Sequence, residues 1–432
     1  MAGPLVLVLG MLVVTLSGGI WVGVSLMSIG IVALEVFRDM RVDRFLAGDI
    51  WSSSTAVELI TLPLFILMGE LLFHTRLSEN LFAGLAPWAR YLPGRLVHVN
   101  VMGCALFAAV SGSSAATTAT VGRITLQELL SRGYDRRLAV GSLAGAGTLG
   151  FLIPPSIPMI VYGVVADVSI LELFMAGIVP GIILAAMFMG WIAYKAWREP
   201  GLVPPQEPPV PRAVALKALA NLFPIIFLIG FVMGSLYFGF ASITEAAAMG
   251  VLGALLVALA QRTLSLRGLW QALLGTVRTC SMIGLILVGA LFLSKAMARL
   301  GLPAEIANTI QSWGLTPWML IGVLLLFYLA LGCVLDGLSA IVMTLPVTLP
   351  LAAAAGFDTI WYGVFLIITI EMAQITPPVG FNLFVIQGLT KEGIFRIAGY
   401  AWPFCVIMMV FTGFITAFPD VVTFLPHSMR GG

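Results

Sequence analysis

The sequence predicts an all-α integral membrane protein made of two inverted-topology repeats, each with a re-entrant helical hairpin and a proline-broken membrane helix. Of its 432 residues, 60% are hydrophobic and only 10% are charged, whereas soluble domains carry about 25% charged residues. Double prolines interrupt two long apolar stretches, at Pro154-Pro155 and at Pro377-Pro378. Similar apolar patterns also recur in the two halves of the chain, which indicates an internal repeat.

The composition excludes several other classes of protein. Met1–Leu16 lacks a basic region and a small-residue cleavage site, so it is expected to be a retained membrane segment and not a secretory signal. The four cysteines are far apart in apolar segments, which favours packing over a disulfide or metal framework. No basic run of the kind that binds nucleic acid is present.

A polar, proline-rich linker over 198–212 separates the predicted first repeat, 1–197, from the second, 213–432. The repeat is supported by a near-constant offset of about 220 residues between matching patterns. The matches pair Phe65–Gly69 with Leu285–Gly289, Gly112 with Gly332, and Pro154 with Pro377.

Each half is expected to contain two apolar segments, a third segment, a hairpin, a broken helix and a final span. In the first half they cover about 4–18, 20–36, 56–73, 97–130 (hairpin), 138–165 (broken helix) and 169–195. In the second half they cover about 217–238, 244–261, 279–294, 317–353 (hairpin), 359–388 (broken helix) and 397–418. We interpret both hairpins as re-entrant, because each has a polar or glycine-rich centre.

The distribution of Lys and Arg supports this topology. With five spans and one non-crossing hairpin per half, 16 of these residues fall in inside loops and 6 outside, as the positive-inside tendency requires. Both termini then lie on the periplasmic side, and the odd number of crossings inverts the second half. Arg38, Arg41 and Arg44 run against the rule, and one long tilted span over 4–36 would place the amino terminus on the other side.

The first hairpin tip, Ser111–Thr120, is rich in hydroxyl groups and small residues. Proline breaks helices, and in hydrocarbon a broken helix persists only where it faces protein or lines a wet cavity. Hydroxyl oxygens and unwound carbonyls can hold a cation such as Na⁺ without a buried charge. Next to the break at Pro154, the tip therefore predicts a cation site, although small residues alone also suit a close helix-packing face.

The second tip, Leu331–Ser339, contains Asp336, and a carboxylate within apolar sequence is a functional candidate. Asp336 could ligate a cation or contact solute, or it could only cap the following helix. Polar residues also flank the second break: Glu371, Gln374 and Thr376. Three further charged residues could each have a functional or a structural role. Glu245, near a predicted outer membrane boundary, could belong to the site or could stabilise a helix start. Lys295 and Arg299 could attract an anionic solute or be solvated loop charges.

Four motifs, in order along nearly the whole chain, resemble the large membrane subunit of TRAP transporters, the DctM type of the ion transporter superfamily. They are Ser111–Gly122, Gly147–Gly163, Thr244–Ala248 and Ile375–Phe384. The two proline motifs are specific. The chain departs from the family at Ser242–Glu245, where relatives often read Thr-Pro-Thr-Glu, and without that proline we expect a smoother helix start.

The resemblance implies a large permease of the cell inner membrane that imports an organic acid, such as a C4-dicarboxylate or a sialic acid, by Na⁺ symport with an elevator mechanism. It implies three partners: a small four-helix membrane subunit, an extracytoplasmic substrate-binding protein and the lipid bilayer. Two Na⁺ sites follow, one between each tip and its break. The implied cation ligands are Ser111, Gly112, Gly150, Pro154, Ser156, Gly332, Gly337, Thr376 and Gly380. The implied solute-binding residues are Ser113, Ser114, Arg299, Asp336 and Thr376.

Three alternatives remain open from the residues. A proton-coupled carrier would use Asp336 or Glu371 as its relay. An intramembrane serine hydrolase would use Ser339, but it needs a base, and the three histidines (His74, His98 and His427) lie outside the later spans. A membrane scaffold without transport would bind partners only. We therefore expect a transporter and not an enzyme.

Overall fold

The computed structural model describes residues 2–38, 40–56, 58–205, 211–302, 305, 308, 316–333 and 335–430. Every regular element in these ranges is a helix. Within them, five helices are long and apolar enough to cross a membrane, or eight if each bent pair counts as one span. The chain is therefore a multi-pass membrane protein, with an all-helical fold as predicted.

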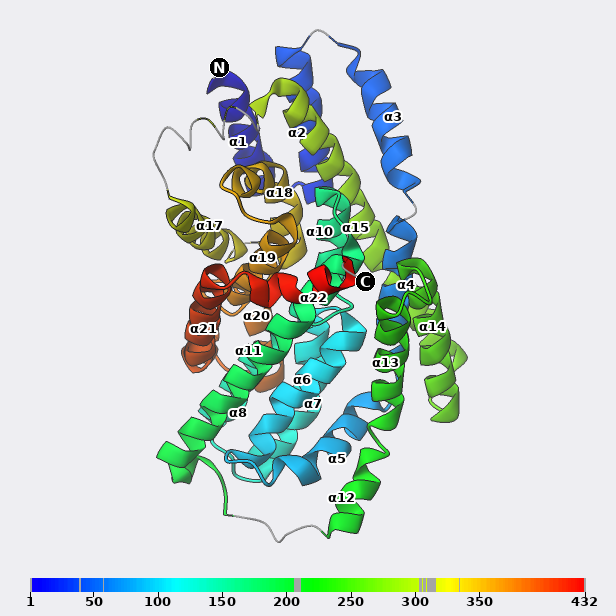
Figure 1. Cartoon of the computed structure of the whole chain (residues 1–432), viewed down its shortest axis with the longest axis vertical. Coiled ribbons are helices and arrows are strands. Elements are labelled where there is room, and N and C mark those ends of the chain that lie inside the picture. Colours follow the sequence, from blue (N-terminus) through cyan, green and yellow to red (C-terminus); the bar gives the residue numbers. More distant parts are fainter. Residues whose placement is uncertain are drawn as a thin grey trace.

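One group of helices gathers around the long helix α15 (Figure 1). Helix α15 packs against α2, α3 and α4, and α14 packs on the other side of α4 against α13. The helices of this group, which we call the outer group, are α1 (Ala2–Ser17), α2 (Val22–Phe37), α3 (Val42–Ser54), α4 (Glu58–Phe73), α13 (Phe223–Tyr237), α14 (Ile243–Ala260) and α15 (Leu266–Leu300).

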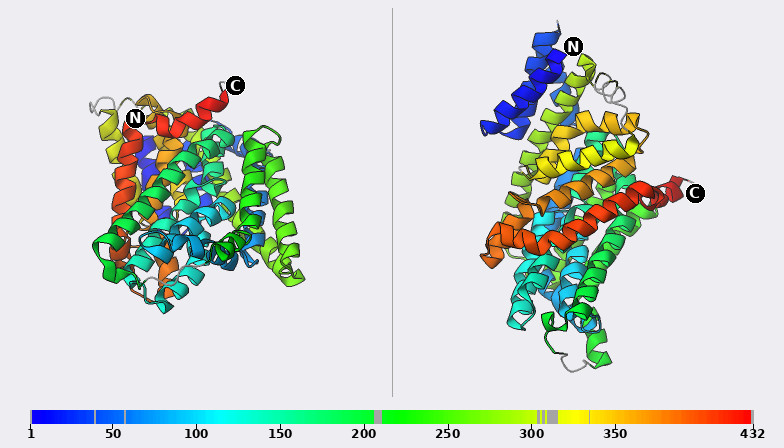
Figure 2. Two further views of the ribbon diagram at one scale, coloured as in Figure 1. Left: turned by 60° about the horizontal axis from the view of Figure 1, so that its bottom comes forward. Right: turned by 90° about the vertical axis from the view of Figure 1, so that its left-hand side faces the viewer.

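A second group, which we call the inner group, holds both proline breaks (Figure 2). At its centre α19 is buried from Ile360 to Gln374. The inner group consists of α6 (His98–Ser111), α7 (Ser114–Ser131), α8 (Arg136–Gly147), α9 (Leu149–Leu152), α10 (Ile157–Ala166), α11 (Ile170–Arg198), α17 (Pro317–Gly332), α18 (Gly337–Ala354), α19 (Thr359–Gln374), α20 (Phe381–Thr390) and α21 (Ile394–Ala417). The other elements are α5 (Leu77–Ala89), η1 (Arg95–Val97), η2 (Pro200–Leu202), α12 (Arg212–Leu219) and α22 (Asp420–Arg430).

Side-chain caps fix where several of these helices begin. The Asp358 carboxylate accepts hydrogen bonds from the Ile360 and Trp361 amides at the start of α19, at 2.8 and 2.9 Å. Ser242 and Glu245 form a capping box at the start of α14, which satisfies amides that have no partner within the helix. Glu245 thus stabilises the first turn of its helix, one of its two expected roles.

Residues 4–36 form two helices, α1 and α2, in agreement with the expected segments 4–18 and 20–36, and not one long span. The structure differs from the expected segments elsewhere. The segment expected at 279–294 lies within α15, which continues at both ends into stretches that contain Arg or Lys. Helices α3, α5 and α22 lie outside the expected segments, because those segments follow apolar length and each of these three helices contains several polar residues. The division into two inverted repeats stays a prediction, and residues 206–210 of its linker lie outside the described residues.

Candidate ion and solute site

The first hairpin turns at Ser111–Ser113. Gly112 has a φ of 58°, the left-handed region that glycine adopts without strain. The Ser113 hydroxyl caps α7 by accepting a hydrogen bond from the Ala116 amide at 3.4 Å. The hydroxyls of Ser111 and Thr117 lie 2.8 Å apart. The tip is thus a tight turn with hydroxyl oxygens on both of its helices.

The first break lies directly against this tip. The Ile157 amide, at the start of α10, donates to the Gly112 carbonyl at 3.3 Å. A Cβ added to Gly150 would lie only 2.5 Å from Ser114 Cα. The Ser156 hydroxyl is fully buried, donates to the Phe151 carbonyl at 2.5 Å and caps α10 at the Met159 amide.

Of the predicted first-site residues, Ser111–Ser114, Gly150, Pro154 and Ser156 thus come from one tip and the break that packs on it. The peptide bond between Pro154 and Pro155 is cis.

The second tip packs on the second break in a similar way. Cys333 Sγ lies 3.3 Å from the Pro377 carbonyl oxygen, and a Cβ on Gly332 would lie 2.5 Å from Ala373 Cβ. Gly380 has a φ of 49°, and a Cβ there would lie 2.8 Å from the Thr376 carbonyl oxygen. Val334, within this tip, lies outside the described residues. The peptide bond between Pro377 and Pro378 is also cis.

Two second-site side chains have local hydrogen bonds. Asp336 caps α18, because its Oδ2 accepts from the Ser339 amide at 3.1 Å. The Thr376 hydroxyl donates to the Met372 carbonyl at 2.6 Å. Gly337 lies beside Gln374, since a Cβ there would be 2.5 Å from Gln374 Nε2. Capping is therefore one role of Asp336.

Glu371 connects the second broken helix to the first tip. Its carboxylate accepts hydrogen bonds from the Ser114 hydroxyl at 2.8 Å and from the Phe151 amide at 3.1 Å. Asn382, on α20, donates to the same Ser114 hydroxyl at 2.6 Å. From the sequence, Glu371 is expected only as a proton relay, and Asn382 has no expected role. The available signal was a carboxylate and an amide on either side of the proline break.

A cavity of about 460 Å³ opens beside the first tip, between the outer and inner groups. Its wall includes the hydroxyl-bearing residues Ser111, Ser113 and Thr279, and Glu70 is its ionisable residue among those described. The other lining residues are Ile66, Gly69, Phe73, Phe107, Ala115, Ala116, Ala119, Ile157, Phe381 and Val385. This cavity is large enough for a small organic molecule.

The predicted solute-binding residues fall into different surroundings. Ser113 lines the cavity, whereas Ser114 is fully buried behind it. The exposed Arg299 guanidinium lies over the ring of Phe45 on α3, 4.0 Å from its centroid, and the Arg299 carbonyl accepts from Arg38 at 2.6 Å. Lys295 forms an ion pair with Asp49. In the described part of the chain, these contacts tie α15 to α2 and α3.

The oxygen atoms at the tips are mostly carbonyls and hydroxyls. Among the described residues, no group of three or more His, Cys, Asp or Glu side chains could hold a metal ion. That arrangement does not suit zinc or a redox metal. Carbonyl and hydroxyl oxygens at helix ends are instead the ligands that alkali cations accept in membrane carriers.

Comparisons with known proteins agree with the membrane fold. Two solved transporter structures are similar: Alcanivorax borkumensis YdaH, with a TM-score of 0.59 and 13% identity over 87% of this chain and 88% of that one, and Neisseria gonorrhoeae MtrF, with a TM-score of 0.51 and 10% identity over 85% and 81%. At these identities the likeness concerns the fold alone.

Sequence comparisons identify the family. The chain is 29% identical to the C4-dicarboxylate TRAP transporter large permease protein DctM of Rhodobacter capsulatus, over 98% of both chains. It is 32% identical to the protein of that name in Pseudomonas aeruginosa, over 89% of this chain and 90% of that one. It is 29% identical to the sialic acid large permease SiaM of Vibrio cholerae, over 96% and 97%. The family profile of the tripartite ATP-independent periplasmic transporter DctM component matches residues 9–421, and the chain belongs to this family.

Proposed function

We propose that the protein is the large permease of a tripartite secondary transporter of the inner membrane, and that it imports an organic acid together with Na⁺. The observation that carries the proposal is the contact between each hairpin tip and a proline break, seen at Gly112 with Ile157 and at Cys333 with Pro377. Broken helices whose freed carbonyls meet a hairpin tip provide ion sites in membrane carriers. The cavity beside the first tip would receive the solute.

The names of the relatives support the proposed solute class. Their names cover C4-dicarboxylates, sialic acid and 2,3-diketo-L-gulonate, which are all organic acids. We propose an organic acid as the solute, delivered by an extracytoplasmic binding protein, with a small membrane subunit alongside. A longer relative from Oleidesulfovibrio alaskensis is named isethionate TRAP transporter permease protein DctMQ, and this chain covers 66% of its length.

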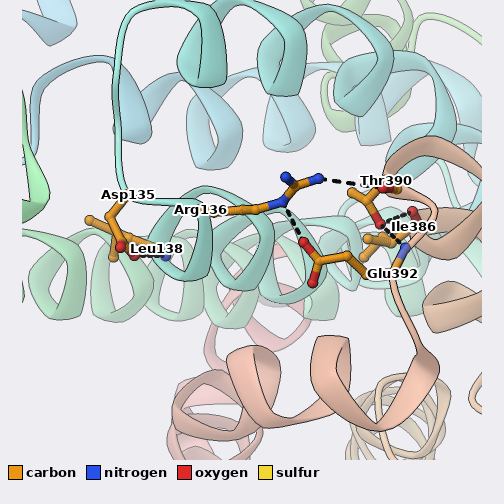
Figure 3. A network of polar contacts seen from close by, with 6 residues as sticks. All are labelled: Asp135, Arg136, Leu138, Ile386, Thr390 and Glu392. Atoms are coloured by element: carbon orange, nitrogen blue, oxygen red, sulfur yellow. Dashed lines mark hydrogen bonds and ion pairs between the residues drawn. The ribbon is translucent and has the colours of Figure 1, made fainter.

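The proposed motion is an elevator movement of the inner group against the outer group. Such a movement requires the two broken helices to move together. At one end of the inner group, Arg136 at the start of α8 forms an ion pair with Glu392, just after α20, and donates to the Thr390 carbonyl at 3.4 Å (Figure 3). Thr390 in turn donates to the Ile386 carbonyl at 2.9 Å. These contacts join the two broken helices and support their movement as one body.

The test is uptake by proteoliposomes that contain this chain, the small subunit and the binding protein. Radiolabelled succinate, sialic acid and 2,3-diketo-L-gulonate serve as the solutes. Uptake is expected to collapse when external Na⁺ is replaced by K⁺ at constant pH. Persistent uptake in K⁺ would reject Na⁺ coupling, and uptake that follows an imposed pH gradient without Na⁺ would favour a proton-coupled carrier.

A further inference from the structure

Glu371 is a buried carboxylate that joins two distant parts of the inner group. It lies on α19, is 1% exposed, and bonds to Ser114 and Phe151, which precede it by 257 and 220 residues. A carboxylate removed from water is costly unless it is paired or hydrogen-bonded. A buried Glu371 carboxylate therefore requires partners that stabilise its negative charge.

The contacts of Glu371 lie at the interruption between α8 and α9. Gly147 ends α8, and Phe151 lies four residues later in α9, so an unbroken α-helix would join the Phe151 amide to the Gly147 carbonyl. Here the Phe151 amide donates to Glu371 Oε1 at 3.1 Å, and the Ser114 hydroxyl lies 3.0 Å from the Gly147 carbonyl. Glu371 and Ser114, which also bond to each other, thus occupy the opening in the helix.

The Ser114 hydroxyl has more acceptor neighbours than it has hydrogens to donate. The Ser114 hydroxyl already accepts from Asn382 Nδ2 at 2.6 Å. It has one hydrogen to give but two oxygen neighbours, the Gly147 carbonyl and Glu371 Oε2. One of those oxygens is therefore left without a hydrogen from Ser114.

Two further buried oxygens without a partner belong to residues beside this cluster. Asn382 Oδ1 and Thr118 Oγ1 are fully buried and unpaired in the described structure. Thr118 Oγ1 is adjacent to Gly147, because a Cβ there would lie 1.9 Å from it. The Thr118 hydroxyl carries one hydrogen of its own, but both oxygens also have lone pairs to offer, and a small cation binds where such oxygen lone pairs converge.

We propose that Glu371 supplies the negative charge that balances the cation at the first tip, and that it connects occupancy of that site to the second broken helix. The inference rests on the proposed Na⁺ coupling. The cation would offset the burial of the carboxylate, and the carboxylate would raise the affinity for the cation. Because α19 and α20 contribute Glu371 and Asn382, an occupied first tip would be held to both halves of the second proline-broken helix.

The alternative is that Glu371 only satisfies the Phe151 amide. Substitution by glutamine separates the two roles. Glutamine has nearly the same shape, its oxygen can accept from the Phe151 amide, and its amide group can donate to the Ser114 hydroxyl. Glu371→Gln therefore keeps the hydrogen bonds and removes the charge.

The experiment measures the Na⁺ concentration that gives half-maximal uptake in the complete reconstituted system. It also measures the Na⁺ concentration that gives half-maximal thermal stabilisation of the purified chain in detergent. Glu371→Gln is expected to raise both by tenfold or more, with the half-saturating solute concentration at saturating Na⁺ within twofold of the unmodified protein. The matched control is Glu245→Gln in the exposed capping box of α14, where glutamine keeps the cap and Na⁺ dependence should not change.

A second variant, in which the carboxylate is moved from position 371 to position 382, is used if Glu371→Gln is not recovered as folded protein. Glu371→Gln with Asn382→Asp returns one carboxylate to the neighbourhood of the Ser114 hydroxyl, and its Na⁺ response is expected within tenfold of the unmodified protein. Unchanged Na⁺ dependence in Glu371→Gln, or no Na⁺ response in the double variant, overturns the inference. Absence of a Na⁺ response in the unmodified protein rejects the proposed function instead.

Discussion

Gly150→Ala offers the sharpest test of the contact between the first tip and its break. A Cβ at this position would lie 2.5 Å from Ser114 Cα, 2.7 Å from Ser114 N and 2.8 Å from Ser113 C. All three atoms belong to the backbone, so no side-chain rotation can relieve the clash and the tip must move away from α9. Overpacking of this kind costs about 1–3 kcal/mol. At about 1.4 kcal/mol for each factor of ten, the Na⁺ concentration for half-maximal uptake should rise by roughly 5- to 150-fold.

The control for this variant is Gly190→Ala, in the long helix α11. A Cβ there meets nothing within 4 Å, and both changes bring the same gain in helix propensity, about 1 kcal/mol. Na⁺ titrations of uptake and of thermal stability are run on both variants. Wild-type Na⁺ dependence in a correctly folded Gly150→Ala protein would falsify the claim that the first site needs close contact between the tip and α9.

Three further predictions concern the second tip. Gly332→Ala, whose Cβ would lie 2.5 Å from Ala373 Cβ, should weaken Na⁺-dependent uptake at least fivefold, whereas Gly322→Ala on the same helix meets open space and should not; equal uptake by the two variants contradicts the prediction. Asp336→Ala should lower the free energy of unfolding by about 1 kcal/mol, because the α18 cap is lost, whereas Asp336→Asn should retain the cap. Thermal unfolding measures both effects. A stable Asp336→Asn protein without uptake would assign Asp336 a role beyond capping. Ser339→Ala should retain uptake, and the unmodified protein should not react with a fluorophosphonate serine probe; labelling that the substitution abolishes would favour the hydrolase.

The fold class could be predicted because it depends on local signals. Long apolar segments, a low charge content and proline pairs can be recognised directly in the sequence. The structure has its breaks at the two proline pairs, over Ile153–Ser156 and Ile375–Gly380. The elements that were missed, α3, α5 and α22, are short helices with mixed polarity. Tertiary packing, and not apolar length, decides whether such segments become helical.

The candidate site could be predicted only in part, because its polar contacts join residues far apart in sequence. Glu371 stands out as a charged residue in an apolar segment and Ser114 belongs to a hydroxyl-rich tip, but nothing in the sequence indicates that they meet. The contact made by Arg299 could not be predicted either. Its charge suggested contact with an anion, whereas its guanidinium lies over the ring of Phe45. Which partner a charged side chain finds depends on the packing of entire helices, such as α3 against α15.

Phe151 connects the two tips, because it is linked to the first through Glu371 and contacts the second directly. Its amide donates to Glu371, which also holds Ser114 at the first tip. Its ring lies against the second tip, since a Cβ on Gly337 would be 2.8 Å from Phe151 Cε2. A cation that draws the first tip toward α9 must therefore adjust a residue that the second tip contacts. Because closely packed groups transmit displacement with little loss, this short helix gives the two proposed cation sites a physical route to cooperate.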